Sequence, residues 1–194
     1  MQLQVGDKTF ATVAIIGQEL LAAHDKQPAI TILESALRIG TKDATLKGSV
    51  YSALSNAYWI IGNVKRALYY MHQDLSVTKE LKDEAGMCRV YGNLGNAHYA
   101  ESSFEEAMKN YNQQLTLARN LNQRTLVSQA LSSLGRVHVA LKDYASALSS
   151  HTASALLYKE LKAKSSEAKE LGHVGTIYAL IGDFENAVKS QVNH

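Results

Sequence analysis

Residues 51–61 read YSALSNAYWII, and the same residue classes return every 40 residues: residues 91–101 read YGNLGNAHYAE, residues 131–141 read LSSLGRVHVAL and residues 171–181 read LGHVGTIYALI. The alignment needs no gap. Within each copy the apolar residues are spaced by three, four and seven, which is the spacing of one helical face. A second column of the repeat is all alanine and predicts close approach of two helices: Ala67, Ala107, Ala147 and Ala187.

The turn between the two halves of each repeat is also legible. Gly62-Asn63 places a glycine where one helix ends and an N-cap residue where the next begins. Ser103 followed by Glu106 predicts a capping box at the corresponding position of the next repeat. Each repeat is therefore predicted to be a helix pair, and the chain is predicted to be all-α, a right-handed superhelical solenoid of antiparallel helix pairs.

The repeats divide the chain into five expected segments. Residues 1–47 are interpreted as a degenerate N-terminal helix pair, with helices over 9–23 and 27–39. They are followed by repeats at 48–87, 88–127 and 128–167 and by a truncated repeat at 168–194. Arrays of this kind normally end on a polar capping helix, and none follows here. We therefore expect a piece of a longer array, with self-association through the open C-terminal repeat as the alternative.

Composition excludes several classes of function. Lys plus Arg total 20 and Asp plus Glu total 18, so the formal net charge of +2 disfavours a nucleic-acid binder or a polybasic membrane anchor. The single cysteine, Cys88, excludes an internal disulfide and fits a reducing, cytoplasmic compartment. His98 and His138 lie one repeat apart in a packing column, so they are interpreted as core residues and not as metal ligands. We expect no enzyme, cofactor, metal or nucleic acid and no membrane span.

The repeat pattern resembles the tetratricopeptide repeat. The features that carry this resemblance are Leu94-Gly95 three residues before His98, an aromatic residue at position 104 and the alanine three residues later. The period of that family is about 34 residues, whereas this one is 40 and lacks the terminal proline. We expect the additional length to follow the last leucine of each repeat: Leu81, Leu121 and Leu161.

Two finer resemblances bear on function. The 40-residue variety, with phrases such as Gly92-Asn-Leu-Gly-Asn96, resembles the repeats of the Pins-type spindle-orientation proteins. Residues 19–40, which are not repeat consensus, resemble the amino-terminal region of a very long animal member of the family. That resemblance implies a scaffold linked to the spindle and cell division, with spindle or mitotic-kinase-related partners. It also implies a place in the cytoplasm, at the cytoskeleton, centrosome, spindle or midbody.

The resemblance further implies a peptide-binding groove lined by the first helix of each pair. The column between the apolar contact points of that helix holds Asn56, Asn96 and Arg136. Asparagine at this position of the family hydrogen-bonds the main chain of an extended peptide, for which an amide has both donor and acceptor. The planar fork of Arg136 suits a carboxylate, so an extended or acidic peptide is the expected ligand.

Three further residues complete the candidate groove set. Trp59 and Tyr99 come one turn after the asparagine column and make the amino-terminal part of the groove aromatic, and Asn93 lies one turn before Asn96. One turn before the asparagine column stand small residues where the carboxylate clamp for chaperone tails needs lysines, so that clamp is not expected: Ser52, Gly92, Ser132 and Gly172.

Each candidate also has a purely structural interpretation. The asparagines would then be solvated surface residues, Arg136 would lie along its own helix, and Trp59 would fill the seam to the preceding repeat. The leading functional hypothesis is a non-catalytic scaffold that binds an extended peptide in spindle or cytokinesis assemblies. Two alternatives stay open, a Pins-like polarity adaptor and a structural spacer that self-associates without a specific groove ligand.

Overall fold

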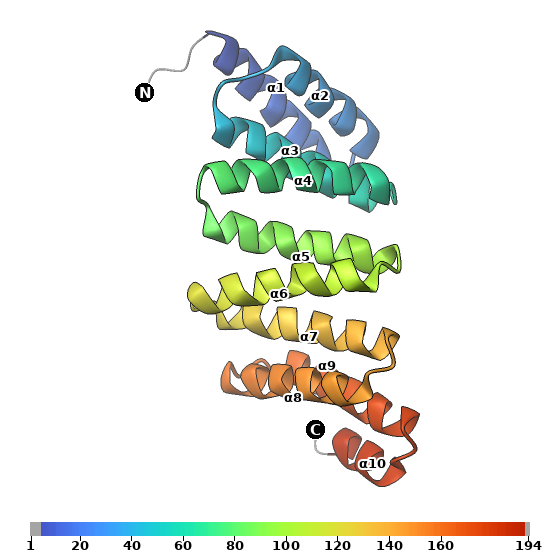
Figure 1. The fold of residues 1–194 in the computed structure, drawn as a ribbon. Coiled ribbons are helices and arrows are strands. Elements are labelled where there is room, and N and C mark those ends of the chain that lie inside the picture. The colour runs from blue at the N-terminus through green and yellow to red at the C-terminus, as the bar shows by residue number, and fades with distance from the viewer. Residues whose placement is uncertain (1–4, 193–194) are drawn as a thin grey trace. The chain divides into compact units, whose positions relative to one another are not determined.

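The computed structural model describes residues 5–192, and within that range it contains ten helices and no strand (Figure 1). The helices follow one another in tandem, and within each of the two compact units described below consecutive helices pack against one another, which confirms the expected all-α architecture. Residues 1–4 and 193–194, at the outer ends of the first and last predicted segments, lie outside the described residues. The helices are α1 (Val5–Ala22), α2 (Lys26–Ile39), α3 (Ala44–Ile60), α4 (Val64–Glu80), α5 (Glu84–Ala100), α6 (Phe104–Asn120), α7 (Arg124–Ala140), α8 (Tyr144–Glu160), α9 (Lys164–Leu180) and α10 (Phe184–Val192).

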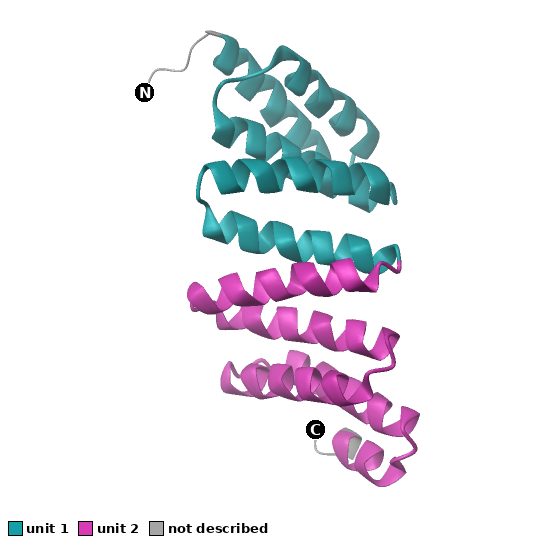
Figure 2. Ribbon diagram, in the orientation of Figure 1, with its two compact units in different colours: residues 1–101 teal, residues 102–194 magenta. Residues whose placement is uncertain are grey.

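The chain forms two compact units, residues 1–101 and residues 102–194 (Figure 2). Unit 1 contains α1 to α5, and unit 2 contains α6 to α10. The helix pairs of the repeat begin at residues 44, 84, 124 and 164, whereas the predicted repeats are framed from 48, 88, 128 and 168. None of the helices described is long and apolar enough to cross a membrane.

The 40-residue repeat consists of two nearly equal halves. Each helix from α3 to α9 has 17 residues, and a three-residue turn separates it from the next. The turn 81–83 is as short as the turn 61–63, so the expectation of extra length after Leu81, Leu121 and Leu161 is wrong. The additional residues lengthen the helices. The middle residue of each turn adopts a left-handed backbone conformation, which closes the helix end and reverses the chain: Gly62, Lys82, Ser102, Asn122, Lys142, Lys162 and Gly182.

Side-chain caps begin some helices and not others. Asn63 accepts a hydrogen bond from the backbone N–H of Arg66, as its position predicts. The prediction of a capping box at Ser103 and Glu106 is wrong, because Ser103 is the N-cap of α6 but its side chain makes no cap hydrogen bond. Glu106 instead lies 3.7 Å from the ammonium group of Lys109 on its own helix. A local sequence pattern therefore identified the helix start but not the contacts of the carboxylate.

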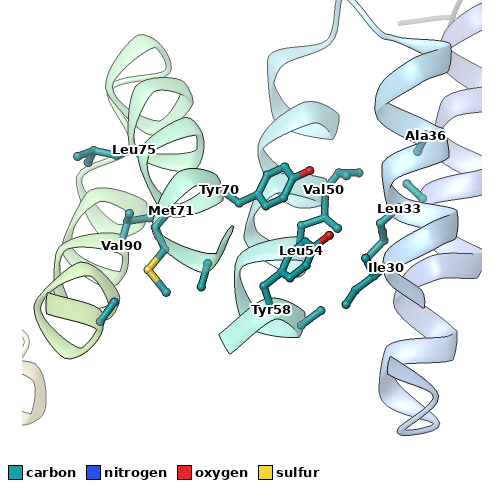
Figure 3. Packing of buried hydrophobic residues seen from close by; sticks show 14 of the residues in the cluster. Ile30, Leu33, Ala36, Val50, Leu54, Tyr58, Tyr70, Met71, Leu75 and Val90 are labelled. Atoms are coloured by element: carbon teal, nitrogen blue, oxygen red, sulfur yellow. The ribbon is translucent and has the colours of Figure 1, made fainter. Parts of the chain in front are cut away.

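The hydrophobic core of unit 1 lies between neighbouring helices. Figure 3 shows Leu33 from α2, Leu54 from α3 and Met71 from α4, all buried, in the spaces between these helices. The members of the alanine column are all buried, as residues between packed helices would be: Ala67, Ala107, Ala147 and Ala187.

A carboxylate from α2 ties three helices of unit 1 together. Glu34 Oε1 accepts hydrogen bonds from Tyr58 Oη at 2.7 Å, from Arg66 Nη1 at 3.0 Å and from Tyr70 Oη at 3.1 Å. Burial and the neighbouring Glu34 charge raise the pKa of Tyr70 to about 12. The phenol therefore stays protonated at neutral pH and remains a hydrogen-bond donor in the joint between α2 and α4.

Candidate functional site

A pocket of about 650 Å³ opens in unit 1 between the first helices of two consecutive pairs. Residues of α3, α4 and α5, of the turn after α4 and Gln18 of α1 line it, and the part lined by the buried residues of α4 is called its floor. Cavities of this size accept one or a few side chains of a peptide. The residues used below all line it: Ser52, Asn56, Trp59, Asp74, Arg89, Asn93 and Asn96.

Four of the six sequence-predicted site residues meet in this pocket. Asn56 and Asn96 are exposed on α3 and α5, Asn93 is half-buried one turn before Asn96, and Trp59 is 37% exposed. Because equivalent positions on α3 and α5 face the same space, three amide side chains converge on one cavity. Tyr99 is half-buried on α5 and does not line the pocket.

The sixth predicted residue, Arg136, belongs to unit 2. It lies on α7, is half-buried, and its Nη2 is 3.5 Å from Ser133 Oγ on the same helix. The structure therefore does not add Arg136 to the pocket of unit 1.

The floor of the pocket contains a charged pair. Asp74 on α4 is only 2% exposed, and its Oδ2 accepts a hydrogen bond from Arg89 Nη2 at 3.2 Å. Arg89 Nη1 donates to Ser52 Oγ at 2.8 Å, so the guanidinium of α5 is held from both α3 and α4. The Arg89 side chain itself is 47% exposed. Arg89 therefore uses Nη1 and Nη2 to hold Ser52 and Asp74, while its side chain forms part of the pocket surface.

The electrostatic balance at Asp74 is dominated by burial. Burial raises the pKa of the Asp74 carboxyl above its ordinary value, and the opposing effects of Arg89 and Ser52 only partly offset it. The half-exposed Arg89 is screened by water, so its attraction for the carboxylate is reduced. The pocket floor therefore contains a carboxylate that its own partners do not fully stabilise.

Sequence reasoning missed both Asp74 and Arg89. A signal was present in the sequence, because the residue just before the apolar column of Leu75 is polar in each complete repeat: Asp74, Gln114 and Ser154. All three are buried. A polar residue that recurs beside an apolar column indicates a polar side chain that faces the core. An expectation that the core is apolar only leaves such a residue out.

Unit 2 has a different buried network at the joint of α7, α8 and α9. Glu170 accepts hydrogen bonds from Ser132 Oγ at 2.7 Å and lies 2.7 Å from His151 Nδ1. Burial acts to raise the pKa of Glu170, but the hydrogen bonds from His151 and Ser132 outweigh it, so the pKa is lowered. Gly135 lies under the His151 ring, where an added Cβ would be 2.5 Å from the ring atoms. That contact explains a glycine in the middle of α7.

The histidine and cysteine side chains supply no metal centre or activated nucleophile in the part of the chain that the structure describes. No group of three or more His, Cys, Asp or Glu side chains among residues 5–192 has an arrangement that could hold a metal ion. His98 and His138 are half-buried. Burial raises the pKa of the Cys88 thiol, which disfavours the reactive thiolate.

Comparison with known proteins shows what the repeats are similar to. Residues 86–160 match the tetratricopeptide repeat family model. Human tetratricopeptide repeat protein 28 is 46% identical over 88 residues, which is 45% of this chain and 4% of that protein. Mouse G-protein-signaling modulator 1 is 31% identical over 74 residues, 38% of this chain and 11% of that relative. These matches confirm the resemblances to a very long animal protein of the family and to the Pins-type proteins, and this chain spans only a small part of each relative.

Solved structures show the same fold. The apo form of RapI superposes with a TM-score of 0.87 at 15% identity over 94% of this chain and 67% of that one. BtubC from P. vanneervenii superposes with a TM-score of 0.80 at 19% identity, over 92% of this chain and 75% of BtubC. MamA superposes with a TM-score of 0.69 at 16% identity, over 98% of this chain and 92% of MamA. These likenesses show the fold alone, an array of helix pairs that follow one another in tandem.

Proposed function

We propose that the pocket of unit 1 holds an extended segment of a partner protein. The observation that carries this proposal is the convergence of Asn56, Asn93 and Asn96 on one cavity of about 650 Å³. Each amide offers a donor and an acceptor, which match the N–H and C=O groups of an extended main chain. Trp59 adds a half-exposed apolar surface at the same cavity for a ligand side chain.

The proposed scaffold is non-catalytic and acts in assemblies of the dividing cell. The match to tetratricopeptide repeat protein 28 favours a spindle or cytokinesis scaffold in the cytoplasm, at the cytoskeleton, centrosome or midbody. The match to G-protein-signaling modulator 1 favours the alternative of a Pins-like polarity adaptor. A spacer that self-associates is the remaining alternative, and it requires no ligand in the pocket.

The test is affinity capture from dividing-cell lysate with quantitative mass spectrometry. The bait carrying Asn56→Ala, Asn93→Ala and Asn96→Ala is compared with the native chain. A control bait carries Asn112→Ala and Asn120→Ala, two exposed asparagines of α6 that lie outside the pocket. Circular dichroism establishes that all baits are equally helical.

We expect a small set of proteins to be retained by the native and control baits and to fall about tenfold or more with the pocket variant, because several hydrogen bonds of about 1 kcal/mol each are lost. The identities of these proteins then separate a cytokinesis scaffold from a polarity adaptor. Equal capture by all three baits overturns the peptide-binding proposal. If light scattering then shows a mass that rises with concentration, the spacer explanation replaces it.

A further inference from the structure

The pocket of unit 1 has two ends with different chemistry. Asn56 and Trp59 line it from the last turns of α3, whereas Thr45 lines it from the first turn of that helix. Because α4 follows α3 after a three-residue turn and packs against it, the last turn of α4 lies beside the first turn of α3. Thr78 of α4 and Asp83 of the following turn therefore belong to the end of Thr45, which is called the Asp83 end.

The charged residues that line the pocket favour a cationic ligand group. Three of its described lining residues are charged: Asp74, Asp83 and Arg89. Arg89 is already engaged, because its Nη2 donates to Asp74 Oδ2 at 3.2 Å and its Nη1 donates to Ser52 Oγ at 2.8 Å. The formal charges of the lining residues therefore leave one negative charge without a cation in the pocket.

The two carboxylates lie near the same part of α4. Thr78 follows Asp74 by four residues, so the two lie on one face of that helix. A Cβ added at Gly86 would be 2.3 Å from Asp83 Oδ2 and 2.8 Å from Thr78 Cγ2, which places the Asp83 carboxylate beside Thr78. The charge of Asp83 also acts to raise the pKa of Asp74. A cation beside Thr78 would thus be attracted by both carboxylates.

The hydroxyl groups of the pocket offer acceptors to a ligand. Three of them donate to a backbone carbonyl oxygen three residues earlier on their own helix, at 2.8–3.1 Å: Ser49, Ser55 and Thr78. Because a hydroxyl group has a single hydrogen, only its lone pairs remain for a ligand. An ammonium group has donors only, whereas a carboxylate has acceptors only. These hydroxyl groups therefore suit a cation and not a carboxylate.

Apolar side chains at the Asp83 end fit the rest of a basic side chain. Leu81 is 44% exposed and lines the pocket together with Val77. Lysine and arginine combine an apolar stem with a charged head, so such a side chain matches a wall that is apolar beside carboxylates. The expectation of an acidic ligand depended on Arg136, which does not line this pocket.

We propose that the Asp83 end of the pocket binds a lysine or arginine side chain of the partner's extended segment, with its stem against Leu81 and Val77 and its head beside Asp74 and Asp83. The inference rests on the proposed function, because it assumes that the asparagines hold the main chain of the same segment. The ligand cation supplies the positive charge that the lining residues lack. It also offsets part of the cost of burying the Asp74 carboxylate.

The test titrates the full chain with hexalysine and follows the indole N–H signal of Trp59 by NMR. Trp59 is the only tryptophan in the sequence and lines the pocket, so its signal reports on that cavity. The comparison probes are hexa(Nε-acetyl-lysine), which keeps the stems without the charges, and hexaglutamate. Hexalysine should bind about tenfold more tightly than either, although the formal net charge of +2 repels it from the chain as a whole. Equal or tighter binding of a comparison probe overturns the proposal.

Variants of the charged residues should change hexalysine binding in opposite directions. Asp83→Asn keeps an N-cap acceptor for the Gly86 N–H but loses the charge, so it should weaken binding about threefold, and about tenfold together with Asp74→Asn. Arg89→Gln removes the cation that competes for Asp74 and should tighten binding several-fold. The control Asp143→Asn changes an N-cap aspartate outside the pocket and should bind as the native chain does. Weaker binding by Arg89→Gln, or equal weakening by the control, overturns the proposal.

The inference and the proposed function can fail separately. Circular dichroism first establishes that each variant is folded, and the exposed position of Asp83 makes Asp83→Asn the safest of them. If hexalysine and its acetylated form bind equally while the asparagine bait still loses its partners, only the basic side-chain subsite is overturned. If the asparagine bait keeps its partners while hexalysine binding depends on Asp83, the main-chain proposal is overturned and the subsite remains.

Discussion

Among the residues that the structure describes, each unit contains one buried carboxylate at a joint of three helices, and the pKa values of the two carboxylates shift in opposite directions. Asp74 in unit 1 is 2% exposed, and its pKa is raised. Glu170 in unit 2 is 3% exposed, and its pKa is lowered. Burial acts to raise the pKa of both carboxyl groups, so the opposite outcomes come from their hydrogen-bonding and charged partners.

The partners differ in how well they are shielded from water. Glu170 is held by His151, which is itself 1% exposed, and by Ser132 at the short distance of 2.7 Å. Asp74 is held at 3.2 Å by the half-exposed Arg89. A buried, close partner compensates for the lost hydration of a carboxylate, whereas a solvated partner does so only in part. We infer that Glu170 stabilises the fold and that Asp74 orients Arg89 at the pocket.

The largest expected effect follows from removing the partner of Glu170. His151→Ala leaves a buried carboxylate with only Ser132, which should lower the free energy of unfolding by about 3–5 kcal/mol. Chemical denaturation followed by circular dichroism measures it. In the double variant His151→Ala with Glu170→Gln, the uncompensated charge is gone, so part of the loss should be recovered. If the double variant is as unstable as His151→Ala, His151 stabilises the fold through packing alone. The proposed difference between the partners of Glu170 and those of Asp74 would then be contradicted.

A second prediction compares two glycines of unit 2. Gly135→Ala places a methyl group about 2.5 Å from the His151 ring, so it should cost roughly 1–3 kcal/mol. Gly172, in the middle of α9, has no atom within 4 Å of such a methyl group. Gly172→Ala should therefore be neutral or stabilise the protein by up to about 1 kcal/mol, because alanine is the better helix former. Thermal unfolding of the two variants measures both changes in stability. Equal changes would contradict the close contact between residue 135 and the His151 ring.

The helix pairs and their period could be predicted from the sequence, because the apolar spacing and the alanine column depend on local geometry that repeats. The turn geometry was only partly predictable. Gly62 signals a left-handed residue, but Lys82 and Ser102 take the same conformation without any glycine. A lysine or a serine gives no local signal for this conformation, so these turn residues could not be identified from the sequence.

The residues of the candidate site also fall into those that the sequence could predict and those that it could not. Asn56 and Asn96 were predictable because they stand in one exposed column of the first helices. Asp74 and Arg89 were not, because their pairing joins α4 to α5 across 15 positions and depends on which side of each helix faces the cavity. The contrast between Asp74 and Glu170 also depends on solvent access at Arg89 and His151, which follows from packing and not from residue type.

The smallest expected effect is a difference in pH dependence, and it tests the comparison most directly. A carboxyl whose pKa is raised on folding stabilises the fold most when protonated, below the unfolded pKa of about 4, and that stability is lost as pH rises through the folded pKa. Asp74→Asn cannot ionise, and its amide oxygen can still accept from Arg89. Relative to the native chain, this variant should therefore gain stability between about pH 3 and about pH 7.

Glu170→Gln is the matched control with the opposite sign. The lowered pKa of Glu170 means that its carboxylate contributes stability above the unfolded pKa of about 4.3, and this contribution is lost as pH falls through the folded pKa. Relative to the native chain, Glu170→Gln should therefore lose stability over the same rise in pH. Urea titrations at several pH values give both differences. Parallel slopes for the two variants would mean that Arg89 compensates Asp74 as fully as His151 compensates Glu170, and Asp74 would then be a structural clamp like its counterpart.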